Sequence, residues 1–303
     1  NPHYWDTDGR RHDPKEWSPL HESGKVVSYL RNEGNVRDTK KPFFIMVGMN
    51  PPHSPYRSLD DCEEEDFNLY RSQPLDSLLV RPNVDLKMKK AESVRYYFAS
   101  VTGVDRAFGQ ILETLKDLGL DKNTVVIFAS DHGETMCSQR TEDPKNSPYS
   151  ESMNIPFLVR FPGKIQPRVD DLLLSSPDIM PTVLEATGAA YPETYHGGNK
   201  IHPLVGTSLF PAITEKVPSL HEYMYWEHQG NRAIRYGNWK AIRDEAGTEW
   251  ELYDIVKDRT EKNNLASQHP DVLKKLRNEW EYWAIKYNVL PKHQDSPMLF
   301  ADT

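Results

Sequence analysis

The chain has few cysteines, no long apolar run and no excess of positive charge. Its 303 residues include only Cys62 and Cys137, which excludes a disulfide framework and leaves a single Cys62–Cys137 bond open. No apolar run approaches the roughly 20 residues that a membrane-spanning helix needs, so we expect no membrane segment. The formal net charge is −8, which disfavours non-specific binding to nucleic acid. A local cationic site could still take an anionic substrate.

An apolar run in the middle of the chain ends in polar residues. Residues 125–129 are apolar and mostly β-branched or aromatic, which predicts a buried strand, and Ser130, Asp131, His132 and Gly133 follow directly. Open α/β sheets place their chemistry at the carboxyl ends of strands. Asp131 and His132 are therefore candidates to offer an oxygen and a nitrogen ligand to one metal ion, and we expect Gly133 to let the chain turn sharply. The alternative is a strand that ends in an ordinary polar turn.

A second apolar run, residues 41–48, predicts another strand, and a proline-rich loop follows it. His53 lies in that loop, where three prolines restrict the backbone. A rigidly held histidine at a strand end suits hydrogen bonding or proton transfer to a ligand. Asn50 is close enough in sequence to orient it. The alternative is a solvated loop histidine.

A polar loop at residues 143–152 precedes a third apolar run at residues 155–161. Lys145 in this loop could be a fixed cation for an anionic group. The alternative is an ordinary surface lysine.

Helical patterns separate these strands. Residues 20–32 and 176–187 are predicted helices, the second with Gly188 just past its end and a purely structural role. A longer amphipathic helix, ending near Gly119 and packed on the sheet, is predicted from apolar residues spaced by three or four. These residues are Val94, Phe98, Val101, Val104, Phe108, Ile111, Leu112 and Leu115. The strand–helix–strand order predicts an α/β fold with a mixed, largely parallel sheet and helices on both faces.

Taken together, these segments and their order resemble the type I, formylglycine-dependent sulfatases of the alkaline phosphatase superfamily. The resemblance runs from about Lys41 to the last predicted helix. Bacterial exo-acting sulfatases of glycosaminoglycans and related glycans look most similar, although the sequence leaves endo or exo action open. The fold implied is alkaline phosphatase-like, and a periplasmic or secreted location goes with the resemblance.

The resemblance implies roles for four residues. Asp131 and His132 match two ligands of one Ca²⁺ ion beside the sulfate, for which a carboxylate is the expected hard ligand. His53 matches a histidine that contacts the sulfate and protonates the leaving sugar oxygen. Lys145 matches a lysine that binds sulfate oxygens. These groups would stabilise charge in the transition state.

The chain also departs from the family. The sulfatase nucleophile is made from Cys or Ser in a Cys-x-Pro-x-Arg motif, and neither Cys62 nor Cys137 has proline two places on. The aspartate pair that completes the metal site has no match either. We therefore expect the nucleophile and the remaining Ca²⁺ ligands on an N-terminal sulfatase segment that precedes this sequence, possibly as a separate chain.

The pattern changes near residue 218. Short strands separated by turns, then a helix over residues 271–287, predict a small α+β subdomain with an antiparallel sheet. We divide the chain into residues 1–217, part of the catalytic α/β domain, and residues 218–303. His228, Arg232 and Arg235 are candidates to reach the substrate from this subdomain. Ordinary strand packing is the alternative for each.

Three functional hypotheses follow. The first is a sulfatase that hydrolyses a sulfated carbohydrate. The second is a phosphonate monoester hydrolase or phosphodiesterase of the same superfamily. The third is a non-catalytic fragment that binds sulfated glycans, because this chain lacks the nucleophile motif.

Overall fold

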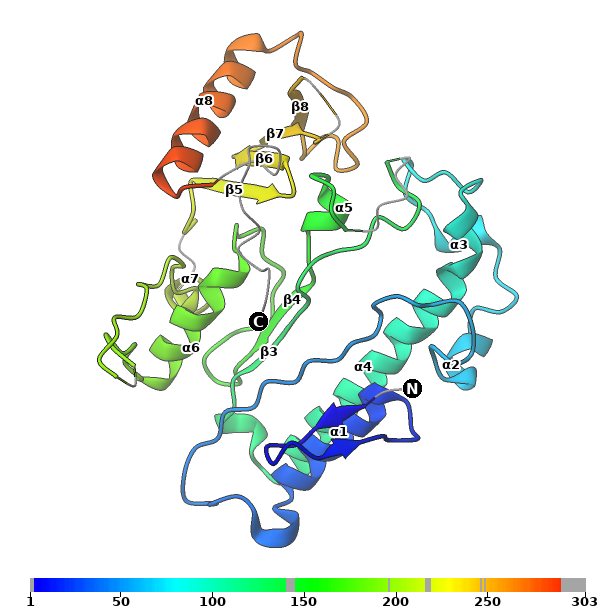
Figure 1. The fold of residues 1–303 in the computed structure, drawn as a ribbon, viewed down its shortest axis with the longest axis vertical. Helices are drawn as coiled ribbons and strands as arrows, with labels where there is room; N and C mark the ends of the chain where they lie inside the picture. Colours follow the sequence, from blue (N-terminus) through cyan, green and yellow to red (C-terminus); the bar gives the residue numbers. More distant parts are fainter. Residues whose placement is uncertain are drawn as a thin grey trace. The chain divides into compact units, whose positions relative to one another are not determined.

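The computed structural model describes residues 3–139, 145–195, 197–215, 219–245, 247 and 249–289. Contacts divide the chain into two compact units (Figure 1). The first comprises residues 1–80 and 84–124, and the second comprises residues 81–83 and 125–303. Among the described helices, none has both the length and the apolar character needed to cross a membrane.

The first unit is mainly helical, and its centre is the packing of α1 on α4. Ser23 Oγ donates to Gln110 Oε1 at 3.0 Å across this contact. A Cβ on Gly103 would meet the Trp17 ring at 2.5 Å, so the backbone of α4 approaches that ring closely. The elements are β1 (Tyr4–Trp5), β2 (Arg11–His12), α1 (Ser18–Leu30), α2 (Glu64–Asn68), α3 (Leu75–Leu78), α4 (Val94–Asp117) and short 3₁₀ turns at Glu33–Asn35, Lys89–Ser93 and Asp121–Asn123.

The long helix predicted from apolar spacing is confirmed as α4. Its buried stripe contains several predicted positions, such as Val94 and Leu115, but Val101 is 40% exposed. Small residues fill much of the stripe, because α1 and α2 pack on it closely within this unit.

The strand predicted over residues 41–48 is wrong. This segment has no regular structure, and Phe44 and Met46 are 74% and 86% exposed. A strand needs a neighbouring backbone to complete its hydrogen bonds, and no described strand pairs with this segment.

The second unit begins with an antiparallel pair, β3 (Val126–Ala129) with β4 (Phe157–Arg160). Both strands were predicted, but the parallel pairing expected between strands does not occur among the described ones, which all pair antiparallel. The other helices before the C-terminal sheet are α5 (Ser150–Met153), α6 (Ile179–Thr187), α7 (Phe210–Glu215) and the 3₁₀ turn Ser176–Asp178.

A four-stranded antiparallel sheet ends the second unit, as predicted. Its strands follow one another in the order β5 (Tyr223–His228), β6 (Asn231–Tyr236), β7 (Trp239–Arg243) and β8 (Glu251–Asp254). Figure 1 shows α8 (Pro270–Lys286) beside this sheet. Ile234, Leu252, Leu276 and Trp280 form the core between them. The division predicted between residues 217 and 218 lies outside the described residues.

Candidate functional site

Asp131 and His132 follow β3 directly and lie beside one another. His132 N–H donates to Asp131 Oδ1 at 2.9 Å, and His132 Nε2 lies 3.5 Å from Asp131 Oδ2. The Asp131 side chain is 85% exposed, whereas that of His132 is 34% exposed. The strand end therefore presents a carboxylate oxygen and an imidazole nitrogen side by side.

A backbone carbonyl selects the tautomer of His132. Its Nδ1 lies 2.8 Å from Gly133 O, so Nδ1 carries the proton that is donated to this carbonyl. The Nε2 lone pair of the neutral ring then points away from that bond. Metal-ligating histidines commonly donate their other ring N–H in this way. The donor set thus fits a metal ion, and the hard carboxylate favours a cation such as Ca²⁺.

The structure shows two donors for that ion and not a complete site. Within the described residues, no group of three or more His, Cys, Asp or Glu side chains could hold a metal. Cys62 and Cys137 are both buried and are not joined by a disulfide, which settles the bond that the sequence left open.

Gly133 is required by close backbone packing. Its N–H donates to Ser152 O at 2.8 Å. A Cβ at Gly133 would lie 2.1 Å from Glu151 O. Gly133 is not among the described residues with positive φ, so close packing and not a left-handed backbone explains the glycine. The glycine instead allows α5 to pack directly on the segment that carries Asp131 and His132.

Lys145 lies five residues before α5, in a segment that the C-terminal sheet holds. The neighbouring Asn146 Oδ1 lies 3.0 Å from His228 Nε2, and Asn146 O accepts a hydrogen bond from Asn231 Nδ2. His228 and Asn231 face each other across the β5–β6 hairpin. The hairpin therefore positions the backbone next to Lys145.

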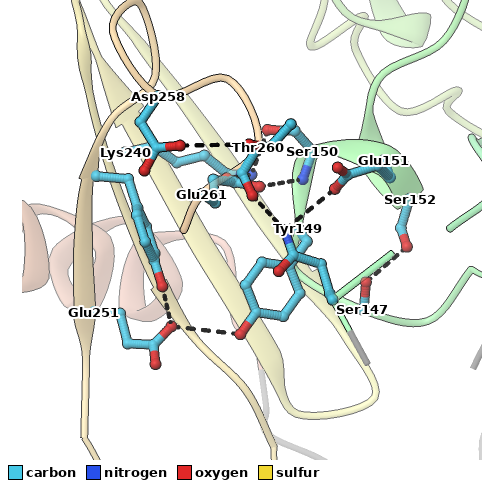
Figure 2. Close-up of polar contacts among 12 residues, drawn as sticks. Ser147, Tyr149, Ser150, Glu151, Ser152, Lys240, Glu251, Asp258, Thr260 and Glu261 are labelled. Atoms are coloured by element: carbon cyan, nitrogen blue, oxygen red, sulfur yellow. Dashed lines mark hydrogen bonds and ion pairs between the residues drawn. The ribbon is translucent and has the colours of Figure 1, made fainter. Parts of the chain in front are cut away.

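Polar contacts continue along the same segment (Figure 2). Ser147 Oγ and Ser152 Oγ lie 2.7 Å apart. The Tyr149 hydroxyl donates to Glu251 Oε2 at 3.4 Å, and burial raises the pKa of Tyr149, with the Glu251 charge adding to the effect. Tyr149 therefore remains a neutral donor.

Glu151 is a buried carboxylate that joins four parts of the second unit. Its side chain is 4% exposed. Asn83 Nδ2 donates to Glu151 Oε1 at 2.6 Å, Gln139 Nε2 donates to Oε2 at 3.4 Å, and Arg81 lies 3.9 Å away. Asn83 and Gln139 also donate to Thr260 O. These contacts tie α5 to the loop after Gly133 and to the loop after β8.

An ion pair between Lys240 and Glu261 lies under the start of α5. Lys240 Nζ lies 2.6 Å from Glu261 Oε1, with the two side chains 3% and 0% exposed. Burial lowers the pKa of Lys240, and the Glu261 carboxylate opposes that shift. Sequence reasoning missed both residues. In the sequence, Lys240 could have been singled out only because it stands between apolar neighbours in β7. No sequence feature singled out Glu261.

The three residues of the C-terminal sheet that were predicted to reach the substrate lie on two different faces of the sheet. His228 and Arg235 share the face of Ala233, against which Tyr149 and Met153 pack. Arg232 lies on the opposite face, where its guanidinium is 4.9 Å from the Trp280 ring centroid. Arg235 Nε donates to Gly237 O at 3.2 Å, and burial lowers the pKa of Arg235. The sheet brings His228 and Arg235, but not Arg232, to the side of the Lys145 segment.

His53 belongs to the first unit. It is exposed, its N–H donates to Asn50 O at 3.0 Å, and its Nδ1 lies 2.7 Å from Ser54 O. Because Nδ1 is committed to a carbonyl, proton transfer by this ring would use Nε2. The contact shown between Asn50 and His53 is through the backbone, so it holds the loop and does not orient the ring.

Comparison with known protein families gives two overlapping matches. Residues 25–189 match the family described as Sulfatase, which is more than half of the chain. Residues 144–285 match the family described as N-sulphoglucosamine sulphohydrolase, C-terminal. The second match covers the segment of Lys145 together with the sheet that holds it.

Individual relatives agree with these matches. Over 188 residues the chain is 92% identical to an endo-4-O-sulfatase of Bacteroides thetaiotaomicron, covering 62% of this chain and 37% of that protein. An ulvan-active sulfatase of Formosa agariphila is 30% identical over 202 residues, covering 64% of this chain and 37% of that protein. A solved structure concerned with glycosaminoglycan metabolism by Bacteroides thetaiotaomicron superimposes with a TM-score of 0.84 at 61% identity, covering 95% of this chain and 63% of that one. The chain thus spans less than two thirds of the length of these relatives.

Proposed function

The chain belongs to the sulfatase family, and we propose that it forms part of a sulfuric-ester hydrolase acting on a sulfated carbohydrate. Its fold is the alkaline phosphatase-like fold of such enzymes. One observation carries the proposal most directly. The Gly133 N–H donates to Ser152 O, so the segment of Asp131 and His132 packs on the segment that follows Lys145.

Each residue has a stated role in this proposal. Asp131 and His132 would hold Ca²⁺, through an Asp131 carboxylate oxygen and His132 Nε2. A bound Ca²⁺ would supply positive charge for the sulfate oxygens. Lys145 adds a second cation for the same group. His53 donates a proton from Nε2 to the departing sugar oxygen.

The nucleophile belongs to a part of the relatives that this chain does not span. We propose that a segment with a Cys-x-Pro-x-Arg motif, or its serine equivalent, supplies the formylglycine and the other Ca²⁺ ligands. The exposed apolar side chains Phe44 and Met46 support this, because they offer an apolar strip that such a segment could cover.

The substrate proposal follows from the relatives. The 92% identical relative is named an endo-4-O-sulfatase, and the solved structure at 61% identity concerns glycosaminoglycan metabolism. We therefore propose removal of 4-O-sulfate within a glycosaminoglycan chain. This replaces the exo-acting relatives that the sequence alone suggested. His228 and Arg235 are proposed to lie toward the sugar, from the sheet face that they share. We propose that Arg232 packs on Trp280 and does not contact the sugar.

Two further parts of the proposal concern organisation. We place the catalytic α/β domain at residues 1–217 and the α+β subdomain at residues 218–303, which the start of the four-stranded sheet at Tyr223 supports. We also propose a periplasmic or secreted location, where a sulfated polysaccharide would be met.

The first experiment is the mass of the protein purified from its source, native and denatured, with N-terminal sequencing of every species. We expect a polypeptide with the Cys-x-Pro-x-Arg peptide, joined to this sequence or accompanying it. The same sample should hydrolyse an aryl sulfate faster than the matching phosphate ester. Faster phosphate hydrolysis would favour a phosphodiesterase. Glycan binding without turnover, with no nucleophile peptide, would favour a binding protein.

The role of Lys145 has its own test in that active protein. Lys145→Ala should lower kcat/KM for a sulfate ester by about 10²–10³, the usual effect of removing one group that stabilises transition-state charge. Lys164→Ala is the matched control, because Lys164 is an exposed lysine outside the candidate site. Equal activities of the two variants would remove Lys145 from the proposal.

A further inference from the structure

The Lys240–Glu261 pair does more than neutralise charge. Lys240 comes from β7, and Glu261 from the loop that follows β8. Besides their mutual contact, both reach Ser150. Lys240 Nζ donates to Ser150 Oγ at 3.2 Å, and the Ser150 N–H donates to Glu261 Oε2 at 2.7 Å (Figure 2). The pair therefore binds the first residue of α5 through backbone and side chain.

Two energetic costs, desolvation and backbone strain, indicate that Lys240 and Glu261 have a role beyond packing. Removing an ion pair from water carries a desolvation penalty that well-packed apolar residues of similar volume avoid. Glu261 also has φ = 52°, in the left-handed region that favours glycine and asparagine. Strain of this kind persists where the surrounding structure over-determines the conformation, and it clusters at functional sites.

The contacts of α5 indicate what the Lys240–Glu261 pair supports. Its carbonyl at Ser152 accepts the Gly133 N–H, next to His132. Its Glu151 side chain joins Gln139 and Asn83. A displacement of α5 would therefore move the segment of Asp131 and His132 and the segment of Lys145 together.

We propose that Lys240 and Glu261 are positioning residues for sulfate-ester hydrolysis, which fix α5 and, through it, the segment of Asp131 and His132 and the segment of Lys145. The inference rests on the proposed function. It gives Lys240 and Glu261 a part in catalysis without contact with the substrate.

The test uses the complete active enzyme and a variant that removes both charges. Lys240→Met with Glu261→Gln keeps the side-chain lengths and leaves no buried charge unpaired. We expect kcat/KM for a sulfated substrate to fall about 10–100-fold, the usual effect of losing the support behind active-site groups. Lys257→Met is the matched control, because Lys257 also pairs with a carboxylate, that of Asp254, but its own side chain is 83% exposed. A double variant as active as this control would overturn the proposal.

A double-mutant cycle separates positioning from general destabilisation. If the pair acts through the placement of Lys145, the same charge-neutral change should cost less than about threefold in a Lys145→Ala background. An equal loss in both backgrounds would show that the pair does not act through Lys145, and would overturn that part of the proposal.

Amide hydrogen exchange provides a readout that needs no activity. In the charge-neutral variant, the Ser150 and Gly133 amides should exchange faster, while those in α4 and α8 should be unchanged. Uniform acceleration would mean global destabilisation and would count against positioning. If the wild-type protein hydrolyses no sulfate ester, the proposed function fails, whatever the exchange pattern shows.

Discussion

Gly133 connects a short sequence motif to the arrangement of the candidate site. The sequence placed a glycine after Asp131 and His132, and a sharp turn was the simplest explanation. The structure gives a different reason, since Glu151 O occupies the space that a Cβ would need. One missing side chain allows α5 to lie against the segment of Asp131 and His132.

A substitution at this position should be costly. Gly133→Ala forces α5 and the Asp131 segment apart, so we expect a loss of about 1–3 kcal/mol in the free energy of unfolding and reduced activity. Gly109→Ala is the control, because nothing lies within 4 Å of its added Cβ in α4. That change should stabilise the protein by about 0.5–1 kcal/mol. Denaturant unfolding of both variants measures the difference, and similar values for the two would contradict the steric argument.

Glu22 in α1 gives a residue-scale prediction about pH. Burial raises its pKa to about 7, and its Oε2 has no hydrogen-bond partner in the described structure. The folded state therefore binds more protons than the unfolded state, and stability should fall as pH rises from about 4.5 to about 7. Glu22→Gln cannot ionise, so its thermal midpoint should fall less than that of the wild type over this range. Parallel curves of midpoint against pH would show that Glu22 is not responsible.

At the scale of elements, α6 shows how one buried carboxylate organises several segments. Asp178 is fully buried and lies in the turn before α6. It accepts hydrogen bonds from Ser175 N–H and Thr207 N–H, and it lies 2.8 Å from His221 Nε2. The helix was predicted from sequence with a structural role, and these contacts give a physical basis for that role.

Removing this carboxylate should destabilise the second unit. Asp178→Ala leaves two backbone donors and His221 without their acceptor, and we expect a loss of about 3 kcal/mol or more. Thermal unfolding is the measurement. Asp170→Ala is the control, since Asp170 pairs with Arg168 at the surface. A change below about 0.5 kcal/mol for Asp178→Ala would contradict the role assigned to it.

At the scale of the whole molecule, the described residues supply only part of the proposed metal site. Asp131 and His132 supply two donors, and in the described structure no third acidic, histidine or cysteine ligand joins them. Metal binding should consequently be tight only in the complete protein.

Removal of metal tests this dependence. In the complete protein, EDTA should lower the thermal midpoint and the activity, and added Ca²⁺ should restore both. Binding at 100 times Kd stabilises a folded protein by about 2.7 kcal/mol. Asp131→Asn should raise the Ca²⁺ concentration needed for restoration at least tenfold, whereas Asp8→Asn should not change it. Full activity in EDTA would argue against a metal-dependent reaction.

The sequence by itself determined the family resemblance, the helices α1, α4, α6 and α8, and the antiparallel C-terminal sheet. These features follow from local patterns of apolar residues, turn residues and short motifs, and such patterns act over a few residues. The candidate residues Asp131, His132, Lys145 and His53 were found in the same way. Their proposed roles are still to be tested.

Only the tertiary structure decided which distant side chains meet. Among the described residues, it left residues 41–48 without a strand partner, because backbone hydrogen bonds need a neighbour that local sequence cannot supply. It placed Arg232 and Arg235 on opposite faces of β6, since side chains alternate along a strand. It also brought Lys240, Glu261 and Ser150 together. Contacts between residues up to about a hundred positions apart leave no periodic signal in the chain, so the support of the candidate site became visible only in the fold.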